Sequence, residues 1–233
     1  MKNSNHLYLF TIITLMLFSC SNKNDFRSSE GIIDFGINYP VKNYDASWER
    51  FIPKKMTMSF KDNVYKNEIS IGVIFNSSII TDCNKKEMIM ILNFKPEKIY
   101  TKLNEQQVAE MLTNLPVPEI INTNAYDSIM GIVSKRYYGV YEDLEDGRDV
   151  QLNETKQILI NNSNWGNQFS EIDGVLINYE IAQFGLNMQF KAHSIDLDSN
   201  VPDSTFSIPK DYIEVSLDVY LYKMNDIFSA FLN

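Results

Sequence analysis

The chain has 233 residues, a formal net charge of −9 and two cysteines. This length suits one sizeable domain and is short for two. The acidic balance argues against nucleic acid and against an anionic bilayer surface as partners, because both would repel the protein.

The first twenty residues have the parts of a secretory signal: Met1-Lys2, an apolar run over Leu7–Phe18, and Ser19 before Cys20. The run is too short to span a bilayer, which takes about 20 residues. Leu17-Phe18-Ser19-Cys20 resembles a lipobox, where a leader is removed and the new terminal cysteine is acylated. We therefore expect residues 1–19 to be a signal peptide and Cys20 to carry fatty acyl chains such as palmitate. A plain signal peptide with an incidental cysteine, or an uncleaved anchor, would be the alternative.

Residues 20–30 are polar and rich in Ser and Asn, which indicates a flexible tether leading into one domain over residues 31–233. Ser21 follows the cysteine, at the position where Asp retains enterobacterial lipoproteins in the inner membrane. Ser21 therefore favours the outer membrane over the inner one. Whether the domain faces the periplasm or the cell surface stays open.

The segment from residue 31 to residue 103 has mostly β patterns. Met56, Met58 and Phe60 alternate with polar residues, which is the period of a half-buried strand. Turns are predicted at 61–63 and 82–86, and a short helix at 43–51. The other strands predicted here are Gly31–Ile37, Tyr65–Phe75, Glu87–Phe94 and Ile99–Leu103.

The alternation breaks at Asn104–Leu112, where a helix is predicted. Asn104 can cap this helix, and Gln107 can reach back to complete a capping box. Val108, Met111 and Leu112 would share one side, so the helix should lie across one face of a sheet.

The second half again favours strands, with hairpin turns at Asp146-Gly147 and Phe184-Gly185. A short strand near residue 213 is expected to pass into a C-terminal helix near Asp218. The strands predicted in this half are Asp127–Tyr141, Val150–Ile160, Val175–Ile181 and Leu186–His193. The whole pattern predicts a mainly β (α+β) fold. We expect a curved, incompletely closed antiparallel barrel or sheet of about nine strands, with one or two helices packed on it.

Five stretches, in this order and spacing, resemble a family of small Bacteroidetes lipoproteins of unknown function. They are residues 31–35, 56–62, 129–135, 172–176 and 204–212. Such proteins are similar in fold to the LolA/LolB lipoprotein carriers, in which an incomplete barrel closed by helices surrounds an apolar hollow. The resemblance implies a binding fold and identifies no binding residue.

Without the leader, His193 is the one histidine and Cys83 the one cysteine that is not committed to lipid. This excludes an intrachain disulfide and a zinc site with two histidines. A Cys83–His193 thiol pair is formally possible, but a lone cysteine in a strand is more often a small buried hydrophobe. The sequence has no nucleotide-binding loop and no nucleophile elbow, and the acidic run at 142–149 lacks EF-hand spacing. We expect no enzyme activity, no metal and no cofactor.

Four methionines, Met56, Met58, Met88 and Met90, occupy alternate positions on two predicted strands. If these strands line a hollow, the flexible side chains would suit a variable apolar ligand; ordinary core packing is the alternative. The sequence thus predicts a membrane-anchored, non-enzymatic binding domain for a hydrophobic small molecule or lipid. The alternative is a structural or assembly accessory of the cell envelope that binds another protein and has no cavity.

Overall fold

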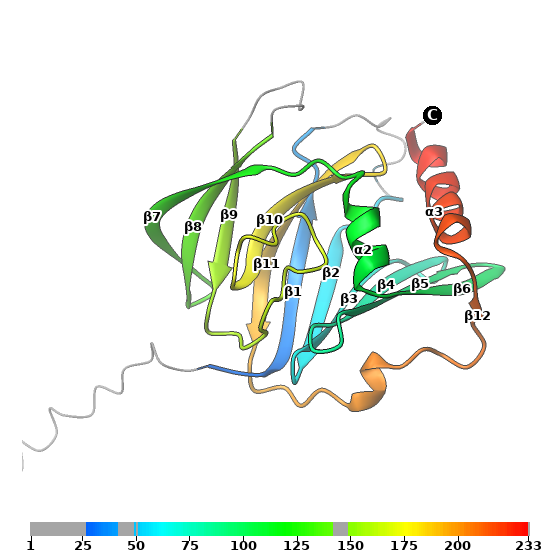
Figure 1. The fold of residues 1–233 in the computed structure, drawn as a ribbon, viewed down its shortest axis with the longest axis horizontal. Coiled ribbons are helices and arrows are strands. Elements are labelled where there is room, and N and C mark those ends of the chain that lie inside the picture. The colour runs from blue at the N-terminus through cyan, green and yellow to red at the C-terminus, as the bar shows by residue number, and fades with distance from the viewer. Residues whose placement is uncertain (1–26, 42–48, 50, 142–148, 233) are drawn as a thin grey trace, which may run out of the picture.

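The computed structural model describes residues 27–41, 49, 51–141 and 149–232. These residues form one sheet of twelve strands in the order β12-β6-β5-β4-β3-β2-β1-β11-β10-β9-β8-β7 (Figure 1). All neighbours run antiparallel except β12, which pairs with β6 in parallel, so the sheet is mixed. It is not closed into a barrel, because β12 and β7 are its two edges. The predicted mainly β class is confirmed, whereas the strand number of nine and the barrel-like closure are wrong.

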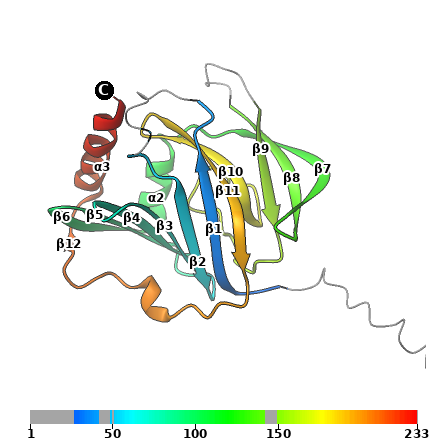
Figure 2. The same cartoon turned by 180° about the vertical axis from the view of Figure 1, so that it is seen from behind.

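The first half of the chain supplies β1 to β6, and the second half supplies β7 to β12. In the first half the bounds are β1 Glu30–Asn38, β2 Lys55–Lys61, β3 Val64–Ile71, β4 Phe75–Asp82, β5 Glu87–Phe94 and β6 Glu97–Leu103. In the second half they are β7 Glu119–Ile129, β8 Ile132–Val140, β9 Asp149–Thr155, β10 Val175–Gln183, β11 Leu186–Asp196 and β12 Ile213–Glu214. The sheet is curved, so that β3–β6 and β7–β9 form two wings beside the central strands (Figures 1 and 2).

Two segments predicted as single strands are hairpins. The segment 65–75 turns at Gly72, which has a φ of 54°, and β4 follows. The segment 127–141 turns at Met130-Gly131, with φ of 52° and 80°, between β7 and β8. Positive φ at both central residues defines the type I′ turn, whose twist matches that of the flanking strands. These turns account for much of the difference between the predicted and observed strand number.

Two α-helices accompany the sheet in the described part of the chain. The helix α2, Glu105–Leu112, begins with the predicted capping box: Asn104 Oδ1 accepts from the Gln107 amide, and Gln107 Oε1 accepts from the Asn104 amide, both at 3.0 Å. The helix α3, Leu217–Leu232, follows β12 as predicted near Asp218. A 3₁₀-helix, η4 (Asp203–Phe206), precedes β12. None of the described helices combines the length and the apolar character that a bilayer span requires.

One face of the central strands is covered. On β1 and β2 the residues Ile33, Phe35, Met56, Met58 and Phe60 are buried in one large core. Figure 1 shows α2, α3 and the connection between β9 and β10 over this face. That connection packs closely: the Tyr65 hydroxyl donates to the Ser163 carbonyl at 2.8 Å. A Cβ on Gly166 would lie 2.7 Å from the end of Met88. The buried side chains of these strands are therefore covered by the protein's own helices and by the β9–β10 connection.

Two predicted elements fall largely or wholly outside the described residues, namely the helix at 43–51 and the turn at Asp146-Gly147. The predicted leader and Cys20 also lie outside them. The described fold begins near Ser28, within the predicted tether: its amide donates to the Gln157 carbonyl at 2.9 Å, and its carbonyl accepts from the Leu159 amide at 2.8 Å.

Candidate functional site

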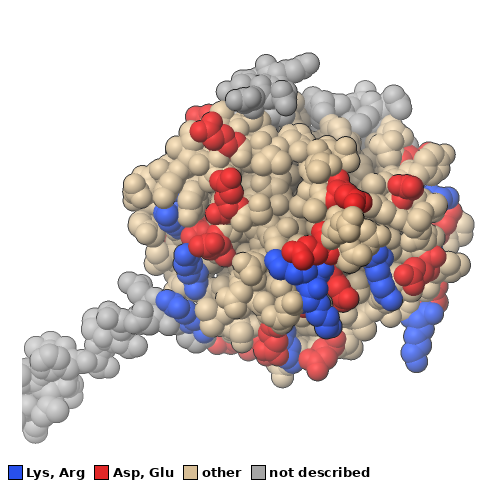
Figure 3. All heavy atoms as spheres, viewed as in Figure 1, with Lys and Arg blue, Asp and Glu red and all other residues tan. Residues whose placement is uncertain are grey.

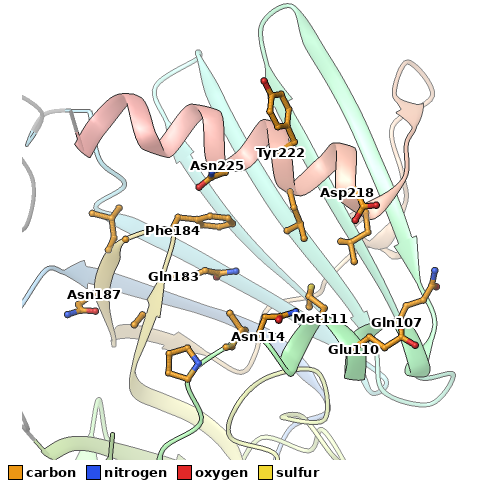
Figure 4. Close-up of a pocket in the computed structure, with 17 residues that line it drawn as sticks. Gln107, Glu110, Met111, Asn114, Gln183, Phe184, Asn187, Asp218, Tyr222 and Asn225 are labelled. Atoms are coloured by element: carbon orange, nitrogen blue, oxygen red, sulfur yellow. The ribbon is translucent and has the colours of Figure 1, made fainter. Parts of the chain in front are cut away.

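A groove of about 1020 Å³ lies between α2, α3 and the hairpin that joins β10 to β11 (Figure 4). Its walls come from three segments that are far apart in the sequence. They are the end of α2 with the connector after it, the hairpin tip, and the first half of α3. The lining residues are Gln107, Glu110, Met111, Asn114, Leu115, Pro116, Ala182, Gln183, Phe184, Gly185, Leu186, Asn187, Leu217, Asp218, Leu221, Tyr222 and Asn225.

The α2 wall is fixed by its cap and by its buried side. Val108 is buried in the main core, and Met111 packs partly against it while reaching the groove. Gln107 both completes the capping box and lines the groove. Glu110 accepts a hydrogen bond from Gln106 at 2.9 Å. An isolated helix of two turns has marginal stability. The cap and the packing of Val108 and Met111 therefore fix the position of α2 beside the groove.

The hairpin wall ends in a two-residue turn, Phe184-Gly185, with φ of 52° and 74°. A left-handed conformation is uncommon for a bulky residue such as Phe and costs conformational energy. The ring of Phe184 stacks on Phe228 of α3, with centroids 5.1 Å apart and planes 2° from parallel. Phe228 is itself buried against Phe75. The stacking therefore ties the hairpin tip to α3 and sets the width of the groove.

The α3 wall is amphipathic. Tyr220 is fully buried, with its hydroxyl 3.4 Å from Ser77 Oγ, and burial raises its pKa to about 12. Lys223 pairs with Glu97 of β6 at 2.7 Å, which fixes the helix to the sheet edge. The groove side carries Leu221 and Asn225. Figure 4 shows Asn225 pointing toward the hairpin, with Gln183 and Met111 directed into the space between the helices.

The lining of the groove combines buried or half-buried apolar side chains with polar ones, most of which are exposed. No lysine, arginine or histidine is among the described residues that line it. The carboxylates Glu110 and Asp218 are both exposed. Elsewhere on the face shown in Figure 3, acidic and basic side chains are intermixed. An anionic group in the groove would meet two carboxylates and no adjacent cation.

A second hollow, of about 380 Å³, lies near the start of the described chain and includes Arg27, Lys135 and Lys156. Two of its cations already have partners. Lys156 lies 3.8 Å from an oxygen of Asp173, and Lys135 lies over the ring of Tyr137, 4.8 Å from its centroid. Its positive charge is therefore partly satisfied within the protein, and the larger groove is the better candidate.

The four predicted methionines lie in the core. Met56, Met58, Met88 and Met90 are each 4–5% exposed. Of the four, Met58 borders a pocket of about 40 Å³, together with Phe35, Tyr65 and Tyr179. That volume is close to what one water molecule occupies in the liquid, about 30 Å³. The structure places these methionines in the same large core and none of them in the lining of the groove, where Met111 is the methionine of the wall.

Cys83 and His193 occupy different surroundings. Cys83 is buried, and its burial raises the pKa of the thiol to about 11. His193 is exposed on β11, where it faces Gly36 of β1. In the described part of the chain, no three His, Cys, Asp or Glu side chains converge as a metal site.

Sequence reasoning did not identify the groove residues. They come from three segments, and each has a local role that explains its sequence: a cap, a turn and an amphipathic helix. The available signal was the bulky Phe in a two-residue hairpin turn, where Asn or Gly is the usual choice.

Comparison with known proteins finds solved structures with a similar fold but no protein family to which the sequence can be assigned. No protein-family description matches the sequence, and no curated protein is similar to it. The solved structures that are similar include two of PNGF-II, in space groups C2 and P21. They superpose with a TM-score of 0.51 at 12% and 10% identity, over 86% and 84% of this chain. This chain matches 32% and 33% of PNGF-II, about a third of its length, and the likeness shows the fold alone. The predicted membership of a Bacteroidetes lipoprotein family with a LolA-like fold stays a prediction.

Proposed function

We propose that this chain is a membrane-anchored, non-enzymatic binding domain that takes its ligand in the groove between α2, α3 and the β10–β11 hairpin. The observation that carries the proposal is the groove itself. Its volume of about 1020 Å³ reaches the upper end of the range for ligand sites, roughly 300–1,000 Å³, and an apolar base with a few polar groups is their usual lining.

The interior of the sheet is a weaker candidate for the ligand. The methionine-lined side of the sheet is filled by α2, α3 and the β9–β10 connection, which leave the pocket of about 40 Å³ beside Met58. An acyl chain between Met56, Met58, Met88 and Met90 would need the covering layer to move away. The groove needs no such rearrangement.

Binding is a better proposal for the groove than hydrolysis. A catalytic carboxylic acid works near neutral pH when burial raises its pKa. The two groove carboxylates, Glu110 and Asp218, are exposed, and Glu110 accepts a hydrogen bond from Gln106.

The anchor in this proposal is Cys20, which lies outside the described residues. The support is the lipobox-like sequence at 17–20, and the outer membrane is the proposed location. Several acyl chains on one cysteine would hold the protein durably, whereas one chain binds only marginally. Labelling with palmitate tests the anchor: we expect label on the wild-type protein and none on Cys20→Ala. Equal labelling of the two would refute it.

Native mass spectrometry of the full-length protein, purified from membranes, tests the binding role. We expect a co-purifying ligand on the wild type and its loss in Asn225→Trp, because a large ring at this exposed position would fill the groove. Asn200→Trp, at an exposed asparagine outside the groove, is the matched control and should keep the ligand. Equal occupancy in all three proteins, or no ligand in any, would contradict the proposal.

The second candidate is a protein-binding accessory of the cell envelope, and β7 favours it. Among the described residues this strand is an edge of the sheet, with no strand paired on one of its sides. Ile121 and Tyr126 are exposed on it, and Met130 is exposed in the turn that follows. Exposed edge strands can pair with a strand of another chain. Ser128→Pro would block such pairing, because proline has no backbone N–H to donate. If envelope proteins co-purify with this variant as they do with the wild type, β7 is not their binding site.

A further inference from the structure

The polar side chains of the groove are mostly amides. Five of the lining residues are Asn or Gln. In the described structure the side chains of Asn114, Gln183, Asn187 and Asn225 make no hydrogen bond with the protein, and Gln107 uses its carbonyl oxygen in the capping box. The groove thus offers a set of paired donors and acceptors that a ligand can use.

From this lining we infer that the groove binds a neutral, polyhydroxylated ligand, namely a segment of an uncharged glycan. The inference rests on the proposed binding function and names its ligand class. A sugar hydroxyl both donates and accepts hydrogen bonds, and a primary amide offers two donors beside an acceptor, so the two groups match.

An acyl chain fits this rim less well. It would cover the amides without giving them partners, and each buried polar group left unpaired carries a desolvation penalty. A fatty acid or a phosphate would also place negative charge beside Glu110 and Asp218, with no cation among the lining residues that the structure describes. The lining therefore disfavours both apolar ligands and anionic ligands.

The apolar side chains of the groove suit the C–H face of a sugar ring. Pyranose rings have an apolar face of C–H groups, and Met111, Leu115 and Leu221 provide apolar surface in the same lining as the amides. The Phe184 ring is held in place by its stacking on Phe228, and Tyr222 is 68% exposed at the rim. Aromatic faces are electron-rich and attract such C–H groups. The volume of the groove, about 1020 Å³, is large enough for more than one sugar ring.

The test uses the full-length protein on an array of neutral and acidic oligosaccharides, with palmitate binding measured in parallel. We expect binding to neutral oligosaccharides. Gln183→Leu and Asn225→Leu should each weaken it about three- to tenfold, since one hydrogen bond is worth on the order of 1 kcal/mol. Both positions are at least partly exposed, so the variants should fold, and circular dichroism checks this. Asn200→Leu is the control and should bind as the wild type does.

Three outcomes would overturn the inference. Binding of palmitate without any oligosaccharide would reject the ligand class and leave the groove as a binding site. Oligosaccharide binding that the two leucine variants do not weaken would place the glycan elsewhere. Failure to bind any probe would count against the ligand class and against the proposed binding function as well.

Discussion

Phe184 combines an unfavourable backbone with a favourable side-chain contact. Its φ of 52° suits Gly or Asn, and its ring stacks on Phe228. A left-handed conformation costs roughly 1–2 kcal/mol for a residue with a Cβ, and aromatic pairing is worth about 0.5–1.5 kcal/mol. The two effects are of similar size, which explains how a bulky residue is tolerated at this turn.

This balance predicts different stabilities for two truncations of Phe184. Both Phe184→Ala and Phe184→Gly lose the stacking, but only the glycine variant also loses the backbone strain. We expect Phe184→Ala to be less stable than Phe184→Gly by about 1 kcal/mol in urea unfolding. Equal stabilities would mean that the turn is not strained.

The buried thiol of Cys83 should be protected in the folded protein. Burial raises its pKa from 9.0 to about 11, so very little thiolate exists at pH 8. We expect slow reaction with a thiol reagent at pH 8 and fast reaction in urea. Because the folded state holds this proton more tightly, its contribution to stability is complete below pH 9 and is lost as the pH rises to about 11. Fast labelling of folded protein would contradict the burial.

At the scale of elements, the capping box positions one wall of the groove. Asn104→Ala removes the acceptor for the Gln107 amide, and a lost cap typically costs about 1 kcal/mol. For a helix of eight residues we expect the loss to appear as local opening. Hydrogen exchange of the α2 amides should therefore increase while that of β5 stays unchanged. Gln106→Ala, on the exposed side of the same helix, is the control.

The sequence predicted elements well where a local signal marks their ends. The α2 cap depends on Asn104 and Gln107 alone, and both its position and its geometry were predicted. The hairpins at Gly72 and Met130-Gly131 were missed because apolar and β-branched residues continue on both sides of each turn. A strand pattern of period two does not show where the chain reverses when the turn residues are not a typical pair.

At the scale of the whole molecule, the mainly β class and one buried face of the sheet were predictable, and the groove was not. The alternation of Met56, Met58 and Phe60 predicted one buried face, which the structure shows. That face is covered in part by the β9–β10 connection, which packs on Tyr65 and Met88. This connection is irregular, so its sequence has no hydrophobic periodicity from which the packing could be predicted. The groove depends further on how Phe184 meets Phe228, 44 residues later in the chain, and pairing over such distances leaves no local signal.

The central claim is that ligand binds between α2, α3 and the hairpin, and the methionines are built-in reporters for it. Methyl NMR of the protein labelled at methionine separates Met111 in the groove wall from Met56, Met58, Met88 and Met90 in the core. On titration with a neutral oligosaccharide chosen from the array, we predict that the Met111 signal shifts and the four core signals stay in place. Shifts of the core signals with Met111 unchanged would place the ligand inside the sheet and contradict the account.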